Sequence, residues 1–173
     1  MKKPSDSQID GLVERKYSLF QASIASACSH AMIQNRISRG LLPMPVEGTG
    51  GLRLFSILDI AKLSLMGELT KKGIAALPAS MVANTVFGTY SGPAIHIISD
   101  IGNHGISGDR IPVASWTAAQ RQKFLGLQSF RGKNSVRLMV DSGEVIRKVK
   151  DRISALPPVR HRGRPRKNTK QEQ

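Results

Sequence analysis

The hydrophobic and polar positions between residues 17 and 40 predict two short helices joined by a tight turn. This stretch holds no proline, and its first glycine is Gly40, so helices are allowed throughout. Ser29 is expected to cap the second helix, because a serine hydroxyl accepts hydrogen bonds from the free N–H groups of a first turn. Small residues near the turn, among them Ala27 and Cys28, would let the two helices approach closely. The residues that share a helical face are Leu19, Ala22, Ala25 and Ala27 in the first helix and Ile33, Arg36, Ile37 and Gly40 in the second.

The next segment, GLLPMPVEGTGGLRLFS at residues 40–56, predicts a short hairpin. Its two prolines cannot continue a helix, while three glycines near its middle permit positive φ at a turn tip. The returning strand is residues 52–55, and alternation places Arg53 and Phe55 on one face and the two leucines on the other. A further helix then begins at Ser56 and Asp59. This helix is expected to end before Gly73. Its apolar side consists of Ile60, Leu63, Leu65 and Met66. Together these elements predict a winged helix-turn-helix.

In this order and spacing, the segments resemble the DNA-binding domain of the MerR-type transcriptional regulators, and also the related excisionase-like winged helices. The resemblance runs from Tyr17 to Ile74, roughly a third of the chain. It is carried by YSLFQASIASACSHAMI in the first two helices, by RGLLP at the exit of the second, by GGLRLFS in the wing and by DIAKLSLMGELTKKGI in the helix that follows. The resemblance implies that the second helix enters the major groove of DNA and that the wing arginine, Arg53, contacts the phosphate backbone.

The second helix departs from the family at the residues that would read DNA. The family carries an arginine and an aromatic pair where this chain has Gln34, Asn35 and Arg36. The base preference of this chain must therefore differ from that of the family. Gln and Asn side chains can pair with adenine N6 and N7, while Arg36 and Arg39 could hold phosphates or guanine. The residues of this helix expected to contact DNA are Ser29, His30, Gln34, Asn35, Arg36 and Arg39.

The charge of the chain favours a polyanionic partner. Lys and Arg number 26 against 12 Asp and Glu, which gives a formal net charge of +14 and a pI near 10.6. Double-stranded DNA is therefore the leading partner. No apolar run approaches the roughly 18 residues of a spanning helix, and MKKPSDSQID at the N-terminus lacks the apolar region of a signal peptide. We expect a cytoplasmic, nucleoid-associated protein with no membrane partner.

Catalytic and metal-binding chemistry is not expected. Cys28 is the only cysteine, so one chain can supply neither an internal disulfide nor a thiolate-rich metal site. Its Ala-rich surroundings favour a buried packing role over redox sensing. His96 and His104 lack a repeated ligand spacing, and no set of nucleophile, base and orienting group is evident. The sequence predicts a protein that is not an enzyme and has no cofactor.

Near the C-terminus the chain contains the sequence Arg162, Gly163, Arg164 and Pro165. This motif resembles an AT-hook, and the resemblance implies an extended segment in the minor groove of A·T-rich DNA. Its glycine would let the backbone approach the groove floor, and its proline would keep the exit extended. The narrow A·T groove attracts arginines through its negative potential. The alternative is a disordered basic tail that raises affinity for any polyanion. The motif is flanked by Arg160, Arg166 and Lys167.

Residues 88–156 predict a small α+β module. Residues 92–116 predict an apolar strand, a Gly-rich turn and a second strand, and residues 135–141 alternate like a strand. Residues 117–125 predict a helix, and residues 142–156 predict another that Ser142 caps. Ahead of the module, residues 74–87 suit one or two short helices around a proline. Dimerisation or effector sensing would suit such a module, since a single helix-turn-helix reads only one half-site; the sequence identifies no effector.

The expected fold class is α+β, with four parts along the chain. These are a flexible leader (1–16), a winged helix-turn-helix domain (17–87), the small α+β module (88–156) and a disordered basic tail (157–173). The expected function is that of a bacterial-type transcriptional regulator, a homodimer that binds double-stranded DNA with sequence preference. The alternatives are an architectural, excisionase-like DNA-bending factor and an accessory protein that binds RNA or another polyanion. The low aromatic content, 5%, argues against recognition of single strands, because few rings are present to stack on bases.

Overall fold

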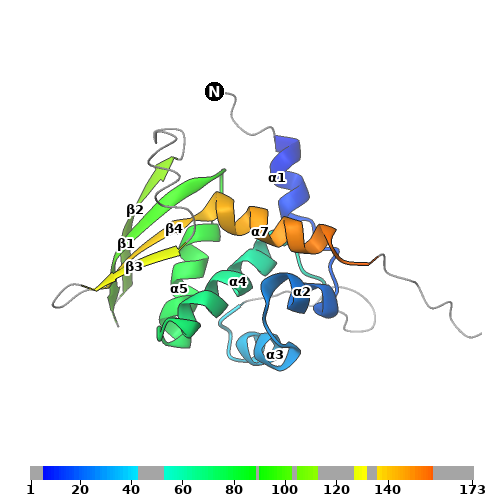
Figure 1. Ribbon diagram of the computed structural model, residues 1–173, viewed down its shortest axis with the longest axis horizontal. Coiled ribbons are helices and arrows are strands. Elements are labelled where there is room, and N and C mark those ends of the chain that lie inside the picture. The colour runs from blue at the N-terminus through cyan, green and yellow to red at the C-terminus, as the bar shows by residue number, and fades with distance from the viewer. Residues whose placement is uncertain are drawn as a thin grey trace, which may run out of the picture.

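The computed structural model describes residues 6–42, 53–88, 90–102, 105–112, 127–131 and 136–157. These residues form an α+β protein, in which helices pack beside an antiparallel sheet (Figure 1). The helices are α1 (Asp6–Val13), α2 (Leu19–Ser26), α3 (His30–Ser38), α4 (Ile57–Lys71), α5 (Ala76–Phe87) and α7 (Ser142–Ser154). The strands are β1 (Ala94–Gly102), β2 (Gly105–Pro112), β3 (Leu127–Arg131) and β4 (Val136–Asp141).

Helix α4 lies at the centre of the helical part, and its start was predicted correctly. Ser56 and Asp59 form a capping box: the Ser56 hydroxyl accepts from the Asp59 N–H at 3.1 Å, and the Asp59 carboxylate accepts from the Ser56 N–H at 3.0 Å. The helix ends before Gly73, whose φ of 86° suits a residue without Cβ. The predicted apolar side is buried: Ile60, Leu63, Leu65 and Met66.

The sheet has the strand order β2-β1-β4-β3, and every neighbouring pair is antiparallel. The two strands predicted on either side of the Gly-rich turn are β1 and β2, while residues 103 and 104 between them lie outside the described residues. The strand predicted at residues 135–141 is β4. Strand β3 was not expected from the sequence, while the helix predicted at residues 117–125 lies outside the described residues. Residues 74–87, expected to hold one or two short helices, contain the single helix α5 (Ala76–Phe87).

Helix α7 begins differently from its prediction. Its cap is Asp141, whose Oδ1 accepts from the Glu144 N–H at 3.0 Å. Ser142, the expected cap, is instead the first residue of the helix. The Ser142 hydroxyl accepts from the Ala94 N–H at 3.0 Å and donates to the Ala94 carbonyl at 2.9 Å. Ser142 therefore ties the start of α7 to the start of β1, a role that its own sequence neighbours do not reveal.

The stretch expected to be a flexible leader, residues 1–16, contains a helix. Residues Asp6–Val13 form α1, and the Leu12 side chain is buried in the core. The Arg15 Nε then lies 3.3 Å from the Asp59 Oδ2, so the segment after α1 is held against the start of α4. One apolar residue and one ion pair thus anchor the leader.

One hydrophobic core contains residues from both sides of the predicted boundary at residue 88. Helix α7 contributes Val145 and Val149 to it, the sheet contributes Ile98 and Leu138, and the segments that precede the sheet contribute most of the remaining residues. Arg152 of α7 also donates to the Ala25 carbonyl at the end of α2, at 3.1 Å, and Figure 1 shows α7 running from the sheet across to α2. The division at residue 88 stays a prediction, but the two parts share their core.

Candidate nucleic-acid interface

Helices α2 and α3 are joined by the three residues Ala27, Cys28 and Ser29. Helix α2 begins with a capping box, in which the Ser18 hydroxyl accepts from the Gln21 N–H and the Gln21 side chain accepts from the Ser18 N–H. Ser29 caps α3 as predicted, because its hydroxyl accepts from the Met32 N–H at 3.2 Å. Local hydrogen bonds therefore fix where both helices begin.

Ala27 makes the turn by adopting the left-handed conformation, with φ 56° and ψ 35°. Its N–H donates to carbonyls of the last turn of α2, and the Cys28 N–H donates to the Ser23 carbonyl at 3.1 Å. The Ser23 hydroxyl closes the turn by donating to the Cys28 carbonyl at 2.7 Å. Glycine is the usual residue here because a Cβ is strained at positive φ. Ala27 was expected on the inner face of α2, but it is exposed in the turn.

Arg36 points into the protein, although it was expected to hold phosphate or guanine. Its side chain is only 5% exposed. Nη1 donates to the Leu63 carbonyl at 3.2 Å and contacts the Cys28 Sγ at 3.4 Å, while Nη2 donates to the Thr70 hydroxyl at 3.4 Å. All three groups lie on or beside α4. Arg36 therefore attaches α3 to α4 and is withdrawn from the residues available to DNA.

Cys28 lies in the same buried cluster, as its predicted packing role requires. Its thiol is 4% exposed and lies 3.5 Å from the Leu63 carbonyl. A Cβ added at Gly67 would stand 3.0 Å from the Cys28 Sγ. The absence of a side chain at Gly67 therefore lets the turn between α2 and α3 approach the α4 backbone.

The opposite face of α3 is exposed and uncharged except at its end. Ile33 is fully buried, and Ile37 packs partly against the core. Ala31, Asn35 and Ser38 follow a spacing of four and three residues, so they lie in one line along the helix. Gln34 lies beside that line, and Arg39 ends it. The exposed residues of this surface are His30, Ala31, Met32, Gln34, Asn35, Ser38 and Arg39.

Two exposed apolar residues of α2 extend this surface, and the sequence patterns did not single them out. Phe20 is 59% exposed and contacts the His30 ring edge-on, with ring centroids 6.3 Å apart, while Ile24 one turn later is 43% exposed. Their spacing of four residues, offset from the buried Ala22 and Ala25, is a signal that could have identified them. The start of the α3 surface is therefore apolar and its remainder is polar.

Arg53 is exposed and stands two residues before a firm anchor. Phe55 is fully buried and forms an isolated antiparallel bridge with Tyr17, whose N–H and carbonyl both bond to it at 3.1 and 2.8 Å. Arg53 and Phe55 were expected on one face of a strand, but one is exposed and the other buried. Alternation fails because this bridge is not part of a regular strand. Residues 43–52, where the predicted hairpin turns, lie outside the described residues.

The predicted tail contacts are also outside the described part of the chain. Residues 158–173, which contain Arg160, Arg162, Gly163, Arg164, Pro165, Arg166 and Lys167, are not described. Their assignment to the minor groove stays a prediction.

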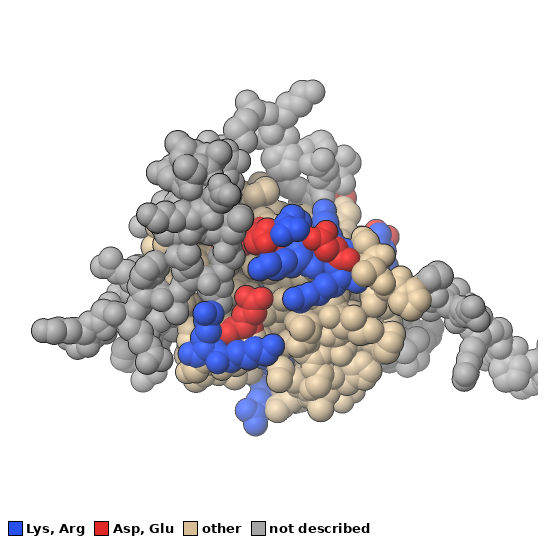
Figure 2. All heavy atoms as spheres, in the orientation of Figure 1, with Lys and Arg blue, Asp and Glu red and all other residues tan. Residues whose placement is uncertain are grey.

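Charges of both signs mix over α7 on the face drawn in Figure 2. Arg147 is paired with Glu144 at 2.7 Å and with Asp151 at 2.8 Å, and Lys148 lies 3.8 Å from Glu144. The hydrogen bonds from Arg147 lower the pKa of the Glu144 carboxyl, against the opposing effect of its partial burial. They also raise the pKa of Arg147. Such a mixed surface offers weaker attraction to a phosphate backbone than one of a single sign.

Within the described ranges, no helix has the length and apolar character needed to cross a bilayer. Those ranges also contain no group of three or more His, Cys, Asp or Glu side chains placed to hold a metal ion.

Comparison of the chain with known protein families finds no family model that matches it, and comparison with curated proteins finds no match.

Proposed function

We propose that this protein binds double-stranded DNA with sequence preference and acts as a transcriptional regulator, with α3 in the major groove. The observation that carries the proposal is the division of α3 into two faces. One face is attached to α4 through Ile33 and Arg36, and the other presents Gln34 and Asn35 to solvent. A reading helix needs both, because its orientation must be fixed before its side chains can meet base edges.

The chemistry of the exposed face suits base edges. Asn35 lies on the central line of that face between Ala31 and Ser38, whose small side chains leave room for close approach to a groove floor. An asparagine or glutamine amide can donate to adenine N7 and accept from adenine N6 at once. No acidic residue occurs in α3, so no carboxylate there would repel phosphate.

Phe20 and Met32 add apolar groups on either flank of this face. Phe20 contacts His30 at the start of α3, and Met32 is 43% exposed. Apolar side chains can recognise the methyl group of thymine. Together with Asn35, they favour a site that contains A·T pairs.

Arg39 and Arg53 are the candidates for phosphate contact. Both are exposed, and each lies close to a fixed point of the chain. Arg39 directly follows α3, and Arg53 lies two residues before the buried Phe55. Contacts of this kind position a protein on the duplex without reading its sequence. In the same proposal, the protein acts as a homodimer on two half-sites, and its C-terminal tail adds minor-groove contacts.

The experiment is selection of bound duplexes from a random pool in moderate salt, with the full chain, a chain that ends at Leu156, and the variants N35A and R53A. R147A is the matched control, since it removes one exposed positive charge from the mixed surface of α7. We expect a discrete motif that survives removal of the tail. N35A should change the preferred base at one position, and R53A should weaken binding to all sequences more than R147A does.

Other outcomes would replace the proposal. Enrichment of A·T content alone, lost with the tail, would indicate a protein that binds DNA through its hook. Equal binding of duplex RNA in competition would indicate a general polyanion-binding protein. Strong bending of phased sites, without effect on transcription from them, would indicate an architectural role.

A further inference from the structure

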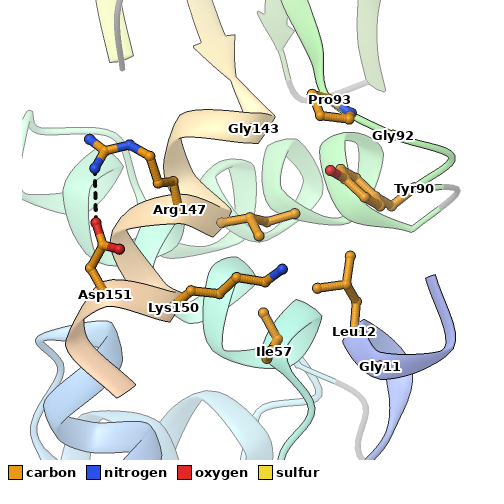
Figure 3. A pocket seen from close by; sticks show the side chains of 11 residues that line it. Gly11, Leu12, Ile57, Tyr90, Gly92, Pro93, Gly143, Arg147, Lys150 and Asp151 are labelled. Carbon is orange, nitrogen blue, oxygen red and sulfur yellow. Dashed lines mark hydrogen bonds and ion pairs between the residues drawn. The ribbon is translucent and has the colours of Figure 1, made fainter. Parts of the chain in front are cut away.

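A pocket of roughly 510 Å³ opens where the N-terminal helix, the start of α4 and the last helix meet (Figure 3). Its apolar lining includes Leu12 of α1, Ile57 of α4 and Ile146 of α7. Each of these three side chains is largely buried. Tyr90 and Pro93, before β1, complete the walls. The volume of the pocket lies within the range of about 300–1,000 Å³ that is typical of small-molecule sites.

One cationic group faces this apolar lining. Figure 3 shows the Lys150 side chain extending from α7 across the pocket, with its ammonium on the side of Leu12. Arg147 and Asp151 also line the pocket, but they are paired with each other at 2.8 Å. Among the described side chains, Lys150 forms no ion pair. The local charge that a ligand would meet is therefore positive.

Two glycines line the pocket, and their surroundings differ. Gly11 lines the pocket from α1, and a Cβ added there would meet nothing within 4 Å. Gly143 lines it from the first turn of α7, where a Cβ would stand 2.8 Å from the Pro93 Cβ. Gly143 thus lets α7 approach β1, whereas Gly11 leaves room that a larger side chain could fill without disturbing the fold.

We propose that this pocket binds a small amphipathic carboxylate, with its apolar body against Leu12, Ile57 and Ile146 and its carboxylate on Lys150. The apolar part of such a ligand would exclude water from the exposed parts of these three side chains, which favours binding. A cationic ligand would meet Arg147 and Lys150, and a neutral one would gain no charge interaction with the Lys150 ammonium. Nucleic acid does not suit the site, because its charged backbone cannot fill an apolar pocket.

The position of the pocket gives binding a route to the α3 surface. Ile57 is the first residue of α4 and follows Ser56, the cap that pairs with Asp59. Phe55, the anchor of the Arg53 segment, comes directly before that cap. A ligand that presses on Ile57 therefore acts on the joint between the predicted wing and α4. This route to DNA depends on the proposed function, whereas binding to the pocket does not.

The test is isothermal titration calorimetry on the full chain with octanoate as the probe. Octan-1-ol is the neutral ligand of equal chain length, and acetate supplies the carboxylate without the apolar body, both at constant ionic strength. We expect saturable one-to-one binding of octanoate, about threefold to fivefold weaker binding of octan-1-ol and no saturable binding of acetate. The factor is small because Lys150 is exposed to water. Absence of saturable octanoate binding, or equal binding of the two eight-carbon ligands, would overturn the proposal.

Variants locate the binding in this pocket. G11L adds a large side chain to the lining at Gly11 and should abolish octanoate binding, while G11A is the matched control and should retain it. Both should fold at least as well as the parent, because glycine inside a helix is unfavourable. K150M should reduce octanoate affinity to the octan-1-ol level, K150R should restore it, and K72M on the exposed end of α4 should leave it unchanged. Unchanged affinity in both G11L and K150M would place the ligand elsewhere and overturn the proposal.

Discussion

Arg36 donates from Nη1 to the Leu63 carbonyl at 3.2 Å, so a charged side chain of α3 is bonded to the backbone of α4 inside the core. Within the described part of the chain, its hydrogen-bond partners are a carbonyl, a hydroxyl and a thiol, with no carboxylate among them. A guanidinium suits this place because its planar fork can reach several acceptors at once. Arg36 therefore sets the angle at which α3 presents its outer face.

Replacement of Arg36 by Met should lower the free energy of unfolding by about 1–3 kcal/mol, because the Leu63 carbonyl and the Thr70 hydroxyl lose their donor. Arg39→Met, three residues later and exposed, should change stability by less than about 0.5 kcal/mol. Urea unfolding at neutral pH measures both. In salt titrations of DNA binding, R39M should reduce the slope of log K against log salt by about 1, and R36M should leave it unchanged. The opposite pattern would mean that Arg36 turns outward to phosphate.

Gly67 and Cys28 should be strongly coupled. G67A places a methyl group 3.0 Å from the Cys28 Sγ, and the thiol cannot withdraw because Arg36 and the Leu63 carbonyl surround it. We expect G67A to destabilise the protein by about 1–2 kcal/mol. In a C28A background the same change should be neutral or stabilising, since alanine is the better helix former. A double-mutant cycle in urea should give a coupling of at least about 1 kcal/mol, and additive effects would contradict this packing.

Ala27→Gly should stabilise the protein by about 0.5–1 kcal/mol. The strain of a Cβ at φ 56° is about 1–2 kcal/mol, and the larger entropy loss of glycine offsets part of that gain. Ala31→Gly, in the ordinary helical conformation of α3, is the matched control and should destabilise by up to about 1 kcal/mol. Thermal and urea unfolding would measure both changes. A loss of stability in A27G would show that the turn does not hold this conformation in solution.

Glu144 should make stability depend on pH in the acid range. Its pKa is lowered in the folded protein, chiefly by hydrogen bonds from Arg147, so folding favours the ionised carboxylate. The stabilisation is present above the ordinary pKa of glutamate, about 4.3, and is lost as the pH falls through the lowered value of the folded state. E144Q should therefore be less stable than the parent at pH 7, and the difference should shrink by pH 3. Urea midpoints at the two pH values give the result. A difference that is independent of pH would assign the effect to packing.

The elements predicted correctly are those whose signals are local. Ser29 and Ser56 cap helices with hydroxyls that act within three residues, and Gly73 ends α4 through its own φ. The buried side of α4 follows from the spacing of its apolar residues. The division of α3 into two faces could also be predicted from the sequence. The spacing of Ile33, Arg36 and Ile37 puts the arginine on the same helical face as the two isoleucines that pack against the core.

The features that were not predicted depend on residues far away in the chain. Ser142 is a good capping residue by type, but its hydroxyl is hydrogen-bonded to the backbone of Ala94, 48 positions away in the chain. Asp141 is the cap of α7 instead. The burial of Arg36 requires acceptors that α4 supplies. Phe55 is buried because Tyr17 pairs with it, and no alternation rule includes a bridge of that kind. Ala27 occupies a position where sequence rules expect glycine.

The bond from Arg152 to the Ala25 carbonyl joins positions 127 residues apart. Together with Val145 and Val149 in the shared core, it means that the helices nearest the N-terminus complete their packing only against the last helix. During synthesis, the ribosome must release almost the whole chain before this core can close. Contacts of such long sequence separation slow folding and leave apolar surface uncovered in the meantime. The nascent chain therefore depends on α7 to reach the folded state, and an early stop before residue 142 would leave α2 and α4 without the contacts of α7.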